Sequence, residues 1–268
     1  MFSLIAIFFL PNQHPKLYRL KLVPTLTQQY QTNSNTNIKI DLGPGAPEKD
    51  LAVQSTGTLK LTIGNIGKNR QNAPVTFKFL GEMAEVSGQL FGDEPSLQKI
   101  PDQSEPAILS NRWIISNLIS PKKLTTSVVS IFSSQQLQVM FLSLPIKPVS
   151  FGQKYRLTLS PGYKGTASIL GHTKKMGDII EADESLPLKI TPAQMTKSLN
   201  QTGSFTTGLA LSMTGKLNYH ITEWINPSNG KVLMSKFTET GTAVMTVAGL
   251  GVSANLKIQG SGTATLRP

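Results

Sequence analysis

The stretch Phe205-Thr-Thr-Gly-Leu209-Ala-Leu211-Ser-Met213-Thr-Gly-Lys-Leu217-Asn-Tyr219-His-Ile221-Thr-Glu-Trp-Ile225 decides the fold. Apolar residues take odd positions, while the even positions are mostly Thr, Ser, Lys, Asn and His, with Trp224 as the exception. Successive side chains of a strand point to opposite faces, so this alternation predicts a long, half-buried strand. Asn226 to Gly230 has the composition of a turn, and the alternation resumes through Ile258. The final third is therefore predicted to be an antiparallel meander.

The same alternation runs through the first 90 residues. Apolar residues fall at even positions from Tyr18 to Leu42, which predicts one long strand or two strands with a bulge. Further strands are predicted over 51–63 and from Val75 to Met83. Three prolines among polar residues predict a loop over 92–106.

Residues 137–161 join the two parts of the chain, and here the apolar period changes. Four residues have the spacing of one helix face, namely Leu137, Met140, Phe141 and Leu144. Ser133-Ser-Gln-Gln136 has the spacing of a capping box, and Pro145 cannot continue a helix. A helix is therefore predicted over 133–144, followed by a strand that begins near Tyr155.

A second short helix is predicted over 191–199. Thr191-Pro-Ala-Gln194 offers a capping residue, a proline at the first helical position and a glutamine at the third. Together these patterns predict a mainly β protein with long antiparallel strands in a curved sheet or half-barrel, accompanied by two short helices.

Two short sequences recur in the same order along the chain. Tyr18–Pro24 matches Tyr155–Pro161 at five of seven positions, and the Leu-Ala and Thr-Gly pairs of 51–59 recur over 209–217. Two recurrences in one order predict two related β-rich halves, 15–150 and 151–268. Chance similarity among strands of restricted composition is the alternative.

Composition favours strands and turns over disorder. Apolar residues make up 39% of the 268 residues and charged residues only 15%, with 22 glycines and 17 prolines. The net charge of +11 is interpreted as solvated strand faces, with attraction to an anionic envelope component as the second interpretation. Paired lysines occur at 122–123 and 174–175 outside any nucleic-acid motif, so no nucleic-acid partner is expected.

Residues 1–14 are interpreted as a degraded or truncated signal-like segment. Phe2 to Leu10 contains eight apolar residues and one serine, which is too short to span a membrane. It resembles the apolar core of a signal peptide without the basic start or the small-residue cleavage site. A buried first strand is the alternative, and no other segment approaches the length of a transmembrane span.

The central motif carries a resemblance to a known group of proteins. Leu144-Pro-Ile-Lys-Pro-Val149-Ser-Phe-Gly-Gln-Lys-Tyr155 after a helix resembles the middle of a family of uncharacterised exported bacterial β-rich proteins. The likeness extends in order over 15–268 and implies a periplasmic or extracellular location. By fold analogy, such sheets resemble the half-barrels of periplasmic lipoprotein carriers, which hold acyl chains on a concave apolar face.

The sequence contains little that indicates catalysis. The chain has no cysteine, which excludes disulfides, thiol nucleophiles and thiolate metal sites, and its three histidines stand outside metal-ligand spacing. No metalloprotease, serine-hydrolase, phosphate-loop or dinucleotide motif occurs. Glu181-Ala-Asp-Glu184 is interpreted as a charged loop. We therefore predict no catalytic residues, no metal and no cofactor, and a hydrolase with a dispersed site is the least favoured alternative.

The leading functional prediction is a non-enzymatic exported protein that binds an apolar ligand or lipid in its curved sheet. Methionine gives an adaptable apolar lining, so the predicted ligand-binding residues are Met140, Phe141, Met213, Leu217, Tyr219 and Met245. The alternative is a structural or interaction module of the bacterial cell envelope whose core is filled.

Overall fold

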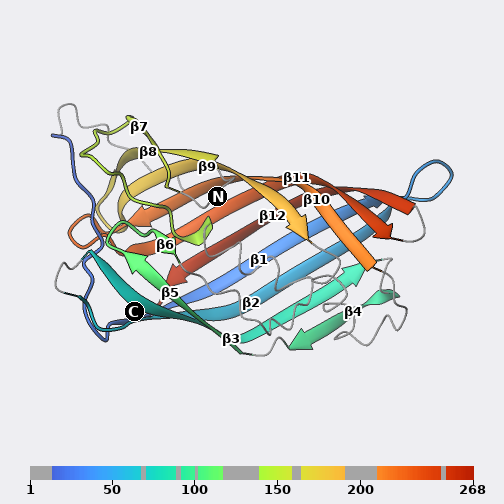
Figure 1. Ribbon diagram of the computed structural model, residues 1–268, viewed down its shortest axis with the longest axis horizontal. Helices are drawn as coiled ribbons and strands as arrows, with labels where there is room; N and C mark the ends of the chain where they lie inside the picture. Colours follow the sequence, from blue (N-terminus) through green and yellow to red (C-terminus); the bar gives the residue numbers. More distant parts are fainter. Residues whose placement is uncertain are drawn as a thin grey trace.

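The computed structural model describes residues 14–67, 71–88, 92–99, 102–116, 139–158, 164–190, 210–248 and 252–268. These residues form one 12-stranded antiparallel sheet that curls around a buried core (Figure 1). The prediction of a mainly β protein with long antiparallel strands in a curved sheet is confirmed. The strands are β1 (Thr27–Asp41), β2 (Lys49–Ile63), β3 (Asn72–Gly88), β4 (Gly92–Lys99), β5 (Gln103–Ser110), β6 (Ile115–Ser116), β7 (Lys154–Arg156), β8 (Lys164–Thr173), β9 (Gly177–Ile190), β10 (Ala210–Ile225), β11 (Val232–Ala248) and β12 (Val252–Leu266).

The first and last long strands meet in the middle of the sheet. The strand order is β6-β5-β3-β2-β1-β12-β11-β10-β9-β8-β7, and β4 pairs with β3 beside this path. The described strands of residues 15–150, β1 to β6, therefore form one flank of the sheet, and those of residues 151–268, β7 to β12, form the other. The β1–β12 pairing joins the two flanks. The relatedness of the two halves stays a prediction from the sequence.

Alternation sets which side chains face the core. On β10, Leu217, Tyr219, Ile221 and Ile225 are buried, while the intervening Asn218 and His220 are exposed. The register aligns Met213 with Met245 of β11 and Tyr219 with Glu184 of β9. The inner side chains of neighbouring strands thus lie side by side on the concave face.

Irregular segments close one end of the curled sheet. Residues 139–153 run from the β5–β6 side to the β8 side, with hydrogen bonds from Leu144 N to Arg112 O and from Gly152 N to Ile169 O. The segment before β1 crosses the same end, because Lys16 forms a bridge with Val149 and Leu20 N donates to Asn111 O. The two flanks of the sheet are therefore tied together at this end.

The helix predicted over 133–144 is wrong over its described part. Only Val139 and Met140 are helical, and the chain then runs irregularly through Pro145 with all its side chains buried. Distant groups replace the helical hydrogen bonds: Leu142 N donates to Glu223 Oε1 at 3.0 Å, and the Arg112 guanidinium donates to Leu144 O. Residues 133–138 and the second predicted helix, 191–199, lie outside the described residues.

Two strand predictions also need correction. The strand predicted from Tyr18 begins only at Thr27, because the amides of Lys16, Leu20 and Lys21 hydrogen-bond to loops at the closed end instead of to a neighbouring strand. The loop predicted over 92–106 instead contains β4 and the start of β5. Both strands lie at the margin of the sheet, where proline is tolerated.

We expect Gly230→Ala to destabilise the protein strongly. Gly230 has a φ of +66°, and an added Cβ would lie 2.4 Å from the backbone oxygen of Arg19. The loss should exceed about 3 kcal/mol, because left-handed strain and overpacking add. Urea unfolding measures the loss, with Gly45→Ala as a control that has a φ of +85° but nothing within 4 Å. Equal losses in the two variants would contradict the close approach.

Candidate functional site

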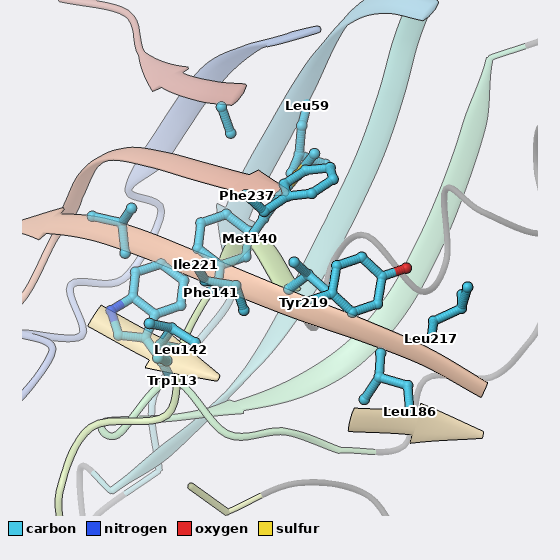
Figure 2. Packing of buried hydrophobic residues seen from close by; sticks show 14 of the residues in the cluster. Leu59, Trp113, Met140, Phe141, Leu142, Leu186, Leu217, Tyr219, Ile221 and Phe237 are labelled. Carbon is cyan, nitrogen blue, oxygen red and sulfur yellow. The ribbon is translucent and has the colours of Figure 1, made fainter. Parts of the chain in front are cut away.

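The structure places the six predicted ligand-binding residues in two groups. Met140 and Phe141 lie in the buried segment 139–145, whereas Leu217 and Tyr219 lie along β10 (Figure 2). Met213 belongs to the same strand. Met245 of β11 is partly buried and stands opposite Met213. The other five side chains are at most 5% exposed and belong to one hydrophobic cluster.

Phe141 holds the first group in place. Its ring stacks on Trp113 with centroids 4.6 Å apart and meets Tyr30 edge-on at 5.2 Å. The indole nitrogen of Trp113 donates to Gly230 O at 2.7 Å. Segment 139–145 therefore packs as a plug at the closed end, and Tyr219 and Leu217 lie further along β10 (Figure 2).

The core also contains six acidic side chains, and sequence reasoning missed them. None of the described lysines, arginines or histidines is buried, although the chain carries 26 Lys+Arg and only 15 Asp+Glu. Buried charged groups are costly unless they are paired or neutralised. The buried acids are Glu82, Glu105, Asp178, Glu184, Glu223 and Glu239.

Two of these acids, Glu184 and Glu239, form a row with Tyr219 across β9, β10 and β11. Glu184 stands opposite Tyr219, and Tyr219 stands opposite Glu239. Glu239 accepts a hydrogen bond from Thr36 Oγ1 at 2.9 Å and another from the Tyr219 hydroxyl, which oppose the rise that burial causes in its pKa. Gly260 leaves room for Glu239, because an added Cβ would lie 2.5 Å from its Oε1.

Glu184 differs from Glu239 because both of its carboxyl oxygens are buried without a hydrogen-bond partner. Burial raises the pKa of Glu184 to about 8, so its carboxyl group holds a proton at neutral pH. A protonated carboxyl group can both donate and accept a hydrogen bond. The Glu184 carboxyl group neither donates nor accepts a hydrogen bond among the described residues.

A second acid lies four residues from Tyr219 on β10. Burial raises the pKa of Glu223 well above its usual range, the Leu142 amide lowers it, and Glu184 raises it further. Glu223 Oε2 has no partner, and neither does the hydroxyl of Ser235, its register neighbour on β11. The Tyr155 hydroxyl is also buried without a partner, and the charge of Glu223 adds to the rise that burial causes in its pKa.

The sequence did contain a signal for Glu184. The interpretation of Glu181-Ala-Asp-Glu184 as a charged loop is wrong, because Gly177–Ile190 is one continuous strand. Glu181 and Asp183 face outward, whereas Glu184 shares the even phase of the buried Ile180, Ala182 and Leu186. An acid in the apolar phase of a strand is the pattern that identifies it.

Asp178 forms a separate cluster at the closed end. It accepts a hydrogen bond from the Tyr18 hydroxyl at 2.6 Å, contacts His172 Nδ1 at 2.7 Å and lies 3.5 Å from Lys16 Nζ. Two of these partners precede β1, so this cluster fastens the start of the described chain to the β8–β9 hairpin.

Two adjoining hollows lie on the outer face of the sheet and share His220 and Thr238. They have volumes of about 560 and 410 Å³. His220 is fixed between Asp183, 2.9 Å from Nδ1, and Glu181, 3.2 Å from Nε2. The hydrogen bond to Asp183 and the two nearby carboxylates raise the pKa of His220, and partial burial opposes them.

The part of the chain that the structure describes contains no group of three or more metal-ligating side chains placed to hold an ion. None of its helices is long and apolar enough to cross a membrane.

No protein-family model matches this chain, and no curated protein matches it in sequence. Among solved structures, DynF from the dynemicin biosynthesis pathway of Micromonospora chersina is similar over 97% of this chain and 95% of its own length. The two share 8% sequence identity with a TM-score of 0.30, and a likeness of that size establishes neither a common fold nor a common function.

Proposed function

We propose that this chain is a non-enzymatic binding protein that holds an amphipathic, lipid-like molecule on the concave face of its sheet. The observation that carries the proposal is the set of buried polar atoms on this face that lack partners, above all the two carboxyl oxygens of Glu184. Buried polar groups are normally hydrogen-bonded, because an unmade bond costs about 1–3 kcal/mol. A ligand with a polar head and an apolar tail would satisfy them.

The apolar surroundings of Glu184 suit the tail of such a ligand. Leu186 follows on the same face of β9 and stands opposite Leu217 of β10 (Figure 2). Met213, also buried, continues the apolar row along β10. Leu217 and Met213 are two of the six predicted ligand-binding side chains. The proposal also places the protein in the periplasm or outside the cell, on the basis of the apolar run Phe2–Leu10 and the central motif.

One observation favours the alternative of a structural or interaction module. The plug 139–145 and the inner side chains of the strands already form one continuous buried cluster. In that case the concave face would only stabilise the fold, and the lysine-rich outer face would meet an anionic envelope component.

Native mass spectrometry of gently purified protein distinguishes the two candidates. The binding function predicts a population heavier than the 29.0 kDa chain, which loses a lipid-sized mass on collisional activation. Solvent-extracted and refolded protein is the control and should take up a fluorescent long-chain probe. A single unliganded mass together with no probe uptake would favour the filled-core module.

A further inference from the structure

Acidic side chains are buried on the inner side of the sheet, whereas none of the described lysines, arginines or histidines is buried. Glu184, Glu223 and Glu239 face the core from three adjacent strands, and no described lysine, arginine or histidine forms an ion pair with them. Cations approach a buried acid at the closed end, where Lys16 and His172 contact Asp178. The middle of the concave face is therefore acidic, although the chain as a whole is basic.

Two neutral groups point to a ligand in the same place. The Ser235 side chain is fully buried on β11, opposite Glu223, and its hydroxyl has no partner. The buried Tyr155 hydroxyl is likewise without a partner and interacts electrostatically with Glu223. Both hydroxyls offer lone pairs and can turn to suit a donor.

We propose that the concave face selects amphiphiles whose head group is a primary amine, an inference that rests on the proposed function. An ammonium group has three donors and no acceptor, so it matches carboxylate and hydroxyl oxygens. A fatty-acid carboxylate would find no described basic side chain to pair with on this face, and any of these glutamates that has lost its proton would repel it.

The groups that face Glu184 determine whether its carboxyl group keeps or releases its proton when a ligand binds. These are Tyr219 and Glu223 on β10 and Glu239 on β11, and none of them is a cation. When an alkylammonium ion binds, the Glu184 carboxyl group releases its proton to the solvent and the resulting carboxylate pairs with the ammonium. A neutral alcohol causes no such release.

Three twelve-carbon probes test the head-group preference: dodecylamine, dodecan-1-ol and dodecanoate. Each is titrated at pH 7 below its micelle concentration into solvent-extracted, refolded protein, and Kd is measured by displacement of the fluorescent probe. We expect dodecylamine to bind at least about tenfold more tightly than dodecan-1-ol, because close buried charge pairs are worth more than 1.4 kcal/mol. Dodecanoate should bind most weakly.

Substitutions at Glu184 and Glu223 test whether these two acids cause the preference for an amine head group. Glu184→Gln and Glu223→Gln keep the side-chain shape and should each reduce the amine preference at least about threefold, whereas the exposed Glu85→Gln should leave it unchanged. Equal binding of the three probes, or a preference for dodecanoate, would overturn the amine selection while leaving lipid binding in place. Failure of all three to bind would overturn the proposed function itself.

Discussion

Phe141→Ala should destabilise the protein by about 3–5 kcal/mol, the range for removing a buried phenylalanine from a packed core. The ring is 2% exposed and contacts Trp113, Tyr30 and Phe77 within centroid distances of 4.6 to 6.4 Å. Its loss would leave a cavity where the plug meets both β1 and β3. Urea unfolding followed by tryptophan fluorescence measures the change.

Ile146→Ala is the matched control for the plug. It lies five residues further along the same irregular segment, and its side chain is 65% exposed. We expect this substitution to lower the free energy of unfolding by less than about 0.5 kcal/mol, because replacing an exposed side chain rarely destabilises a protein more than that. If Phe141→Ala costs no more than Ile146→Ala, the plug does not fill the core.

Glu184→Gln should change how stability depends on pH. In the unfolded chain the carboxyl group loses its proton near pH 4.5, whereas in the folded chain burial raises the pKa to about 8. The folded state therefore binds the proton more tightly, so this group's stabilising contribution is complete below pH 4.5 and declines as the pH rises to about 8. The decline is about 5 kcal/mol at most.

Glutamine cannot ionise, so the Glu184→Gln variant should lose less stability than wild type between pH 4.5 and 8 and should be the more stable protein at pH 8.5. Part of the decline persists, because burial also raises the pKa values of Glu105, Glu223 and Glu239. Glu85→Gln, exposed on β3, should follow the wild-type profile. Parallel profiles for wild type and Glu184→Gln would show that the carboxyl group is not buried as described.

Local alternation was sufficient to predict the strands that have one buried face. The run through Leu217, Tyr219 and Ile221 predicts β10, and the period of β2 is equally clear. The alternation of apolar and polar residues does not predict the structure of segments in which consecutive residues are all buried. Every residue from Val139 to Pro145 is buried, and a short apolar run of this kind satisfies a helical spacing without being a helix.

Other features depend on contacts that the local sequence does not contain. Tyr18 has the phase of a strand residue, but its hydroxyl bonds to Asp178, 160 residues away. The pairing of β1 with β12, which joins the two ends of the chain, has no local signal. For the candidate site, alternation correctly places Met213, Leu217 and Tyr219 on the inner face, and their binding role stays a prediction. Glu184 was missed because charge was taken to mean exposure.

The central claim is that Glu184 is a buried carboxyl group on the concave face with no hydrogen-bond partner among the described residues. Carboxyl carbon NMR titration of protein labelled at glutamate measures this directly, with Glu184→Gln identifying the resonance. We predict that the Glu184 signal in ligand-free protein titrates near pH 8. Titration of that resonance in the ordinary range for glutamate, near 4.3, would contradict the claim and remove the main support for a ligand at this site.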